Sequence, residues 1–280
     1  MALLLAGCGA ALAVPSPGLA TIDPHVGVSV SEIVERNAAA RGGAQAWHRI
    51  ETMAWTGYAE NSGVPGRKVA FMLEQKRPGK VRFEVLEASG MKSVRAYDGA
   101  NGWKMRADGP GLPQVTPYSG DELGFARGAQ VIDGPLMDYV RKGAALSVLG
   151  IDRVDGRPAY VVDARLPSGG LHRVWIDADS FLELRHDREY NDASGRIAVA
   201  TVRFREYHSF EGLLIPLTIE SGNGAGRPVN RLVIERVALN PRLEDAVFDR
   251  PEVVPTRRGR ITVDTRSAAM PSPSSNASRP

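Results

Sequence analysis

Strict alternation of apolar and polar side chains runs through most of the chain and constrains its fold more than any other feature. Apolar side chains recur at every second position over residues 53–57, 69–73 and 81–85, and similar runs follow between residues 145 and 238. A period of two places the apolar side chains of each run on one face of a β-strand. Because tight turns separate most of the runs, we expect consecutive strands to pair antiparallel in a meander.

Short helical segments precede and interrupt these strands. Ser31 is the expected N-cap of a first helix, which ends at the Gly42-Gly43 pair. A second short helix is expected over residues 44–50. Residues 119–142 break the alternation and predict one or two further short helices, which interrupt the sheet and cover its open side.

The number of strands indicates the shape of the sheet. The runs amount to about eleven or twelve strands, and open sheets beyond about ten strands tend to curl or split. We therefore predict a mainly β protein with a few helices (α+β), built on one strongly curled antiparallel sheet or open barrel. This domain is expected to span residues 30–253. No apolar run approaches the roughly 18 residues that a membrane-spanning helix needs.

The charge of the chain gives no support to nucleic-acid binding. The sequence holds 35 basic and 32 acidic residues in 280. Five arginines and one aspartate of this total follow Pro255, which leaves 30 basic and 31 acidic residues elsewhere, a net charge of −1. A nucleic-acid-binding domain would carry a basic face of its own. The segment 256–280, rich in Arg, Ser and Pro, is expected to be a disordered tail.

The N-terminal segment, residues 1–20, predicts export. Residues 4–9, with the single cysteine Cys8, resemble the lipobox of bacterial lipoproteins, in which the cysteine receives the lipid anchor. Few residues precede Cys8 and none is basic, so we expect the natural start to lie upstream of Met1. The alternative is cleavage after Ala13, at an A-x-A-like site. Both interpretations place the protein in a bacterial periplasm, and the first tethers it to the outer membrane.

Catalytic and metal-binding motifs are absent from the sequence. There is no HExxH, no Gly-x-Ser-x-Gly and no Walker loop, so neither a metal nor another cofactor is expected. His172 and His186 fall on neighbouring predicted strands and could meet, but the preferred interpretation is two half-exposed strand histidines. A non-enzymatic protein is therefore predicted, with a secreted hydrolase as a less favoured alternative.

Apolar positions on the predicted strands indicate where a ligand would bind. A sheet face rich in Met, Phe and Trp suits either an ordinary core or an adaptable apolar cavity. On alternation alone, the candidate cavity residues are Trp55, Phe71, Leu73, Phe83, Val85, Trp103, Val174 and Ile176. A slip of one residue would reverse the face of any of them.

Four motifs, in their order along the chain, resemble the bacterial outer-membrane lipoprotein-sorting (LolA-like) superfamily. They are a helix end followed by the first strand, a "DG…W" hairpin, a "W-I-D…L" strand pair and a closing segment. In this sequence they are Ala39–Gly43 with Trp47–Met53 and Gly57, Tyr97–Gly99 with Gly102-Trp103, Trp175–Asp177 with Leu182–Arg185, and Asn240–Pro251. The likeness runs from about Val30 to Pro251.

The resemblance implies an unclosed β-barrel with helices over the opening and an apolar cavity that takes acyl chains. The expected partner is then a lipid or an acylated lipoprotein, and no nucleic acid. An envelope-stress sensor, which uses the same fold to bind a protein regulator, is the main alternative. Enclosing acyl chains has a physical rationale, since exposure to water costs roughly 0.8 kcal/mol per CH₂ group.

Overall fold

The computed structural model describes residues 27–86, 90–107, 113–129, 132–167, 170–223 and 229–252, and contains one large sheet within them. The helices are α1 (Val30–Ala40), α2 (Ala44–His48) and α3 (Gly120–Arg127), with a 3₁₀ turn η1 (Asp245–Val247). The strands are β1 (Thr52–Asn61), β2 (Lys68–Lys76), β3 (Lys80–Leu86), β4 (Lys92–Tyr97), β5 (Gly102–Ala107), β6 (Gln114–Pro117), β7 (Ala145–Val154), β8 (Arg157–Arg165), β9 (Leu171–Asp177), β10 (Glu183–Asn191), β11 (Ile197–Phe210), β12 (Leu213–Asn223) and β13 (Asn230–Leu239).

All thirteen of these strands belong to a single antiparallel sheet in the order β6-β5-β4-β3-β2-β1-β13-β12-β11-β10-β9-β8-β7. Neighbours in the sheet are neighbours along the chain, except at the centre. There the first strand pairs with the last, and Met53 lies opposite Leu239. The two outer strands, β6 and β7, follow each other in the sequence but do not pair, so the sheet is not closed.

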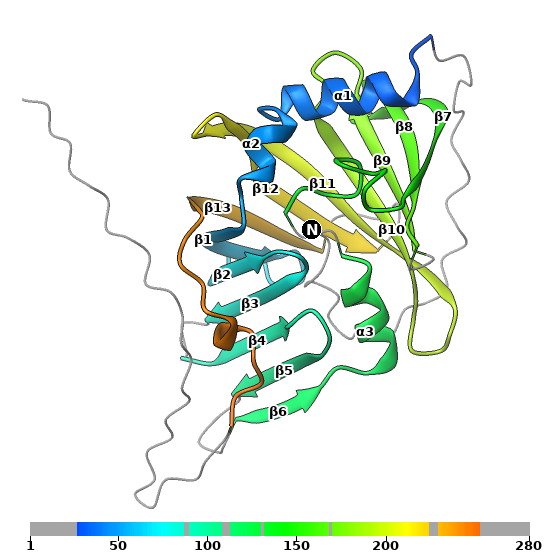
Figure 1. Ribbon diagram of the computed structural model, residues 1–280. Helices are drawn as coiled ribbons and strands as arrows, with labels where there is room; N and C mark the ends of the chain where they lie inside the picture. Colours follow the sequence, from blue (N-terminus) through cyan, green and yellow to red (C-terminus); the bar gives the residue numbers. More distant parts are fainter. Residues whose placement is uncertain are drawn as a thin grey trace, which may run out of the picture.

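The sheet bends around α3. This helix packs against both β5 and β10, which lie eight strand positions apart in the sheet. In a flat sheet that separation would be about 38 Å, at roughly 4.8 Å per strand, whereas α3 is only about 12 Å long. Figure 1 shows α3 lying between the half of the sheet that contains β2–β6 and the half that contains β10. We call the face toward α3 the inner face.

The inner face carries the main apolar core. Trp55 on β1 lies opposite Leu73 on β2, which lies opposite Phe83 on β3, so these side chains form a row across the sheet. They are buried in one cluster with side chains of β11–β13 and α3. On the other half of the sheet, Val174 and Ile176 pack in a second cluster with Ile33 of α1.

The closing segment after β13 packs on the opposite, outer face of the sheet. Trp103 Nε1 donates a hydrogen bond of 2.8 Å to the carbonyl oxygen of Phe248. Lys76 Nζ donates one of 2.8 Å to that of Leu243. Trp103 packs there with Ala96 and Met105. The outer face of β4 and β5 is therefore also buried. In β5 the apolar side chains Trp103 and Met105 lie on this outer face, whereas Lys104 lies in the inner row, opposite Arg95.

Two expectations for the local structure need correction. The structure has thirteen strands rather than about eleven, and the strand that alternation missed is β6, a four-residue edge strand. Helix α1 begins two residues earlier than expected, because Ser29 and not Ser31 is the N-cap, and its Oγ accepts a hydrogen bond from the Glu32 N–H. Of the one or two helices expected over residues 119–142, the described residues contain one, α3, and residues 135–143 form turns.

Two predicted segments lie outside the described residues: Cys8 with the rest of residues 1–20, and the tail from residue 256. Among the residues that the structure describes, no helix is long and apolar enough to cross a membrane.

The close approach of β1 and β13 allows a test of their pairing at the centre of the sheet. A Cβ atom at Gly57 would lie 1.9 Å from the carbonyl oxygen of Val233, at the point where the β1–β13 register shifts. We predict that Gly57→Ala lowers the free energy of unfolding by about 2 kcal/mol or more, measured by urea denaturation. The control is Gly124→Ala in α3, where a Cβ atom meets nothing within 4 Å. It should be neutral or gain up to about 1 kcal/mol. Equal effects at the two positions would contradict the close approach of the strands.

Candidate functional site

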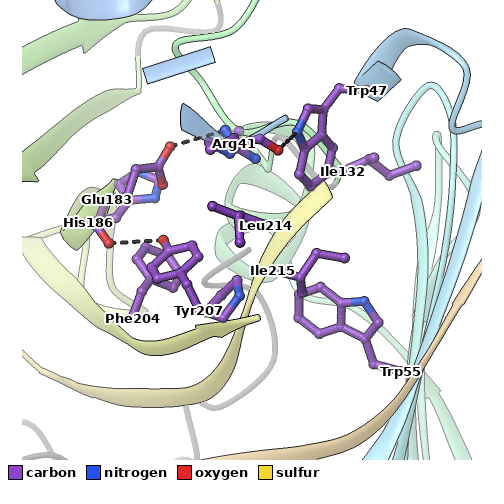
Figure 2. Close-up of a pocket in the computed structure, with 12 residues that line it drawn as sticks. Arg41, Trp47, Trp55, Ile132, Glu183, His186, Phe204, Tyr207, Leu214 and Ile215 are labelled. Atoms are coloured by element: carbon purple, nitrogen blue, oxygen red, sulfur yellow. Dashed lines mark hydrogen bonds and ion pairs between the residues drawn. The ribbon is translucent and has the colours of Figure 1, made fainter. Parts of the chain in front are cut away.

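A small pocket opens at the inner face, between the first two helices and the second half of the sheet. Figure 2 shows its lining side chains, which come from the C-cap of α1, from α2, β1, β10, β11 and β12, and from the segment after α3. Its volume is about 50 Å³. The lining residues are Arg41, Trp47, Trp55, Ile132, Gly134, Glu183, His186, Phe204, Tyr207, Leu214, Ile215 and Pro216.

One wall of the pocket carries an ion pair. Arg41 Nη1 lies 3.3 Å from Glu183 Oε1, and both side chains are 9% exposed. The same nitrogen donates to the carbonyl oxygen of Asp133 at 3.0 Å. Arg41 follows the last residue of α1, and the turn at Gly42 and Gly43 brings Trp47 back toward it. Trp47 Nε1 donates to the Arg41 carbonyl at 2.9 Å, and the Arg41 guanidinium lies 4.5 Å from the Trp47 ring.

The segment after α3 is held over the pocket by charges. Asp133 is buried, and its carboxylate accepts from Arg77 at 2.8 Å and from Lys142 at 2.7 Å. Burial alone would raise the pKa of Asp133, but the two cations outweigh it and lower the pKa below its usual value. This carboxylate therefore stays ionised and ties residues 133 and 142 to the turn before β3.

The opposite wall of the pocket contains a buried donor. Trp55 is 3% exposed, and no acceptor within the described parts of the chain takes a hydrogen bond from its Nε1. Buried indole N–H groups usually have a partner. Trp55 also begins the apolar row that continues through Leu73 and Phe83.

Two histidines meet on the inner face beside the pocket. His172 Nδ1 lies 2.8 Å from His186 Nε2, and both residues are buried. The expectation of half-exposed histidines was wrong, because both side chains point to the covered face. Burial lowers the pKa of His172 to about 3 and that of His186 well below its usual value. No group of three metal-ligating side chains occurs within the described ranges.

Polar contacts hold both ends of α3. At its N-terminus, Glu122 closes a capping box and binds Arg95 of β4 at 2.6 Å and Lys104 of β5 at 2.9 Å. Although burial opposes ionisation, these contacts lower the pKa of Glu122 to about 2. At the other end, Arg188 of β10 donates to the carbonyl oxygen of Phe125, and its guanidinium lies 3.8 Å from the Phe125 ring.

The burial of the Arg188 guanidinium is energetically unfavourable. The residue is 3% exposed, and burial lowers its pKa to about 9. Its described contacts are with Phe125 rather than with a carboxylate. The carbonyl oxygens at a helix C-terminus carry partial negative charge and stabilise a cation. Arg188 therefore depends on α3 for its solvation.

The structure brings most of the predicted cavity residues to one face. Trp55, Phe71, Leu73 and Phe83 are buried together, with the half-buried Val85 packed against them. Val174 lies opposite His186, which lines the same pocket as Trp55. Val174 and Ile176 are thus on the inner face too, but under α1.

Trp103 is the exception among the predicted residues, because it points to the outer face and binds the Phe248 carbonyl. It lies opposite Ala96, and the inner row passes through the neighbouring position, Arg95. The prediction also missed Arg41 and Glu183. Their pairing joins residues 142 positions apart, and no local pattern signals it.

Comparison with known proteins gives structural matches only. No family model and no curated protein matches the chain. The structure matches that of a LolA superfamily protein from Nitrosomonas europaea, with 17% identity, a TM-score of 0.49, and coverage of 79% of this chain and 98% of that one. An outer membrane lipoprotein-sorting protein domain from Vibrio parahaemolyticus matches with 13% identity, a TM-score of 0.48, and coverage of 79% and 97%.

A third match is the MucA/MucB complex of Pseudomonas aeruginosa, at 13% identity and a TM-score of 0.24, covering 75% of this chain and 93% of that one. The structural match that the sequence motifs predicted is therefore found, at low identity. At these identities and TM-scores, it assigns no function.

The histidine pair predicts acid sensitivity. Between about pH 6.5 and pH 3 the unfolded chain protonates His172 whereas the folded protein does not, so the unfolded state binds more protons and stability falls as the pH falls. We expect the free energy of unfolding to decline over this range, and the variant His172→Leu/His186→Leu to decline much less. His208→Leu, at an exposed position, should keep the wild-type slope. Urea denaturation at a series of pH values measures it, and a double variant with an unchanged slope would refute the assignment.

Proposed function

We propose that this protein is a non-enzymatic, periplasmic lipid- or lipoprotein-binding protein that takes acyl chains onto the inner face of an unclosed half-barrel. The observation that carries the proposal is that α3 and the segment after it cover this face, and we call these two parts the cover. A continuous apolar surface lies beneath a short helix that polar contacts hold at both ends. In this proposal, lipidation of Cys8 tethers the protein to the outer membrane for transfer of its ligand.

The size of the pocket requires the cover to move. Ligand pockets commonly hold about 300–1,000 Å³, whereas the closed pocket holds about 50 Å³. An acyl chain therefore enters only when α3 and the segment after it swing away from the sheet. The apolar row that this exposes, from Trp55 to Phe83, is then covered by the chain, and each buried CH₂ group contributes roughly 0.8 kcal/mol.

The contacts at the N-terminus of α3 suit such a movement. The Glu122 ion pairs are partly exposed, and pairs of this kind contribute only about 0–1 kcal/mol each. Polar groups released from them can bind water. The open sheet edges at β6 and β7 leave the bent sheet free to widen, which a closed barrel would resist.

A protein-binding module is the second candidate. The filled interior favours it, because in the closed state the apolar side chains of the inner face already contact one another. An envelope-stress sensor that binds a regulator would have no need of an acyl cavity.

Native mass spectrometry of the full chain tests the first proposal against the second. We expect a co-purifying or added lipid that leaves on delipidation. Phe83→Asp should abolish lipid uptake, because it places a charge in the middle of the apolar row. The control is Leu86→Asp, on the same strand but 47% exposed, which should bind as the wild type does. A protein that takes up no acyl probe would favour the protein-binding module.

Photolabelling keeps this test informative if Phe83→Asp does not fold. A photoreactive fatty-acyl probe should label peptides that contain Trp55 or Phe83 in the wild-type protein. Labelling confined to outer-face peptides, such as the one that contains Trp103, would contradict binding at the inner face.

The cover predicts a kinetic effect. Glu122→Gln removes the charge that binds Arg95 and Lys104, so the closed state is weakened and the rate of acyl-probe uptake should rise about two- to fivefold, as expected for a loss of up to about 1 kcal/mol. Stopped-flow fluorescence of a labelled fatty acyl probe measures this rate. The control is Asp121→Asn. Asp121 carries the same charge in the same helical turn but forms none of the described ion pairs, so its replacement should leave the rate unchanged. A slower or equal rate for Glu122→Gln would argue against opening at α3.

A further inference from the structure

The geometry points to a specificity of the pocket: it selects neutral acyl derivatives, such as esters and amides, and rejects free fatty-acid carboxylates. This inference rests on the proposed acyl binding and names the chemical class of the ligand's polar end. Three observations carry it, namely the balance of charge in the pocket wall, an unused hydrogen-bond donor, and the position of both beside the apolar row.

The charges that line the pocket cancel each other. Arg41 and Glu183 are the only ionic side chains among its lining residues, and they pair with each other at 3.3 Å. Tyr207 and His186 add no charge, because burial raises the pKa of the first and lowers that of the second. Arg41 is therefore already neutralised, and an entering carboxylate would place two anions against one cation in a buried site. Such an uncompensated buried charge is strongly unfavourable.

A donor without an acceptor lies on the opposite wall. Trp55 Nε1 is buried and donates to no acceptor within the part of the chain that the structure describes. A carbonyl oxygen of an ester or amide satisfies one N–H group and brings no charge. Figure 2 shows Trp55 across the pocket from the Arg41–Glu183 pair, so a polar group held here contacts a neutral environment on both sides.

The route of the acyl chain follows from the strand register. Trp55, Leu73 and Phe83 lie directly opposite one another on β1, β2 and β3. A chain whose carbonyl group binds Trp55 therefore continues along this row under α3. The polar end is fixed at one end of the apolar surface, and the chain then meets the side chains of Leu73 and Phe83 before the row reaches Arg95.

A competition between three ligands of equal chain length tests the inference. The full-length protein is delipidated and mixed with equal amounts of palmitate, monopalmitoylglycerol and palmitamide, at a pH at which palmitate is ionised. Native mass spectrometry then gives the bound fractions. We expect the two neutral ligands to exceed palmitate by at least about tenfold. Equal binding of all three ligands would overturn the inference and leave acyl binding intact, whereas no binding of any would overturn the proposed function as well.

Two single variants should shift the preference in opposite directions. Glu183→Gln leaves Arg41 unpaired, so palmitate should gain at least about tenfold relative to palmitamide. Arg41→Gln leaves Glu183 unpaired, so palmitate should be rejected more strongly than by the wild type. The double variant Arg41→Gln/Glu183→Gln restores a neutral wall and should bind palmitate as weakly as the wild type does. Because the two shifts differ in sign, a general loss of structure cannot imitate them, and shifts of equal sign would overturn the assignment.

Trp55→Phe isolates the hydrogen bond from the apolar contact. It keeps an aromatic ring but removes the N–H group, so the affinity for palmitamide and monopalmitoylglycerol should fall about two- to tenfold. The binding of an unsubstituted alkane probe should stay unchanged. Loss of alkane binding to the same extent would show that Trp55 contributes packing alone.

Discussion

The structure depends on the burial of one apolar face of an open, bent sheet. A sheet of thirteen strands with free edges cannot cover that face by closing on itself, so other parts of the chain must do so. The connection between the outermost strands, β6 and β7, supplies α3 and the segment after it, while α1 covers the strands near β7. The chain segment that contains α3 is therefore joined at its two ends to β6 and β7, the two edge strands of the sheet.

Charged side chains hold the cover at its margins, whereas the charges in the pocket wall beneath it cancel each other. The cover is fastened by charges at its margins, through Glu122, Asp133 and Arg188. The pocket wall beneath it has no net charge, because Arg41 and Glu183 pair. Buried ions are retained only where their partners are in place, so each of these contacts is tied to the closed arrangement.

Sequence alone predicted the strands well and their faces mostly well. Period-two alternation identified twelve of the strands, since half-buried strands display it directly, but it missed β6, which is too short to establish a period. Trp103 was assigned to the wrong face because the apolar side chains of β5 point to the outer face, where the closing segment covers them, while Lys104 points inward; alternation does not tell which face of the sheet a strand turns its apolar side toward. The Arg41–Glu183 pair was not predictable, because it joins residues 142 positions apart. The contact of His172 and His186 was foreseen from their neighbouring strands, but their burial was not.

The pairing of the first strand with the last has a consequence for how the chain folds. Residue 53 pairs with residue 239, so the contact at the centre of the sheet has a very large sequence separation. Such non-local pairing slows folding, since the entropy of closing the loop is lost before the contact forms. Until β13 is available, β1 and β12 keep unpaired edges of the kind that lead to aggregation. The two halves of the sheet, β1–β6 and β7–β12, can therefore join only after β13 has been synthesised, and until then each half can form only as a separate meander.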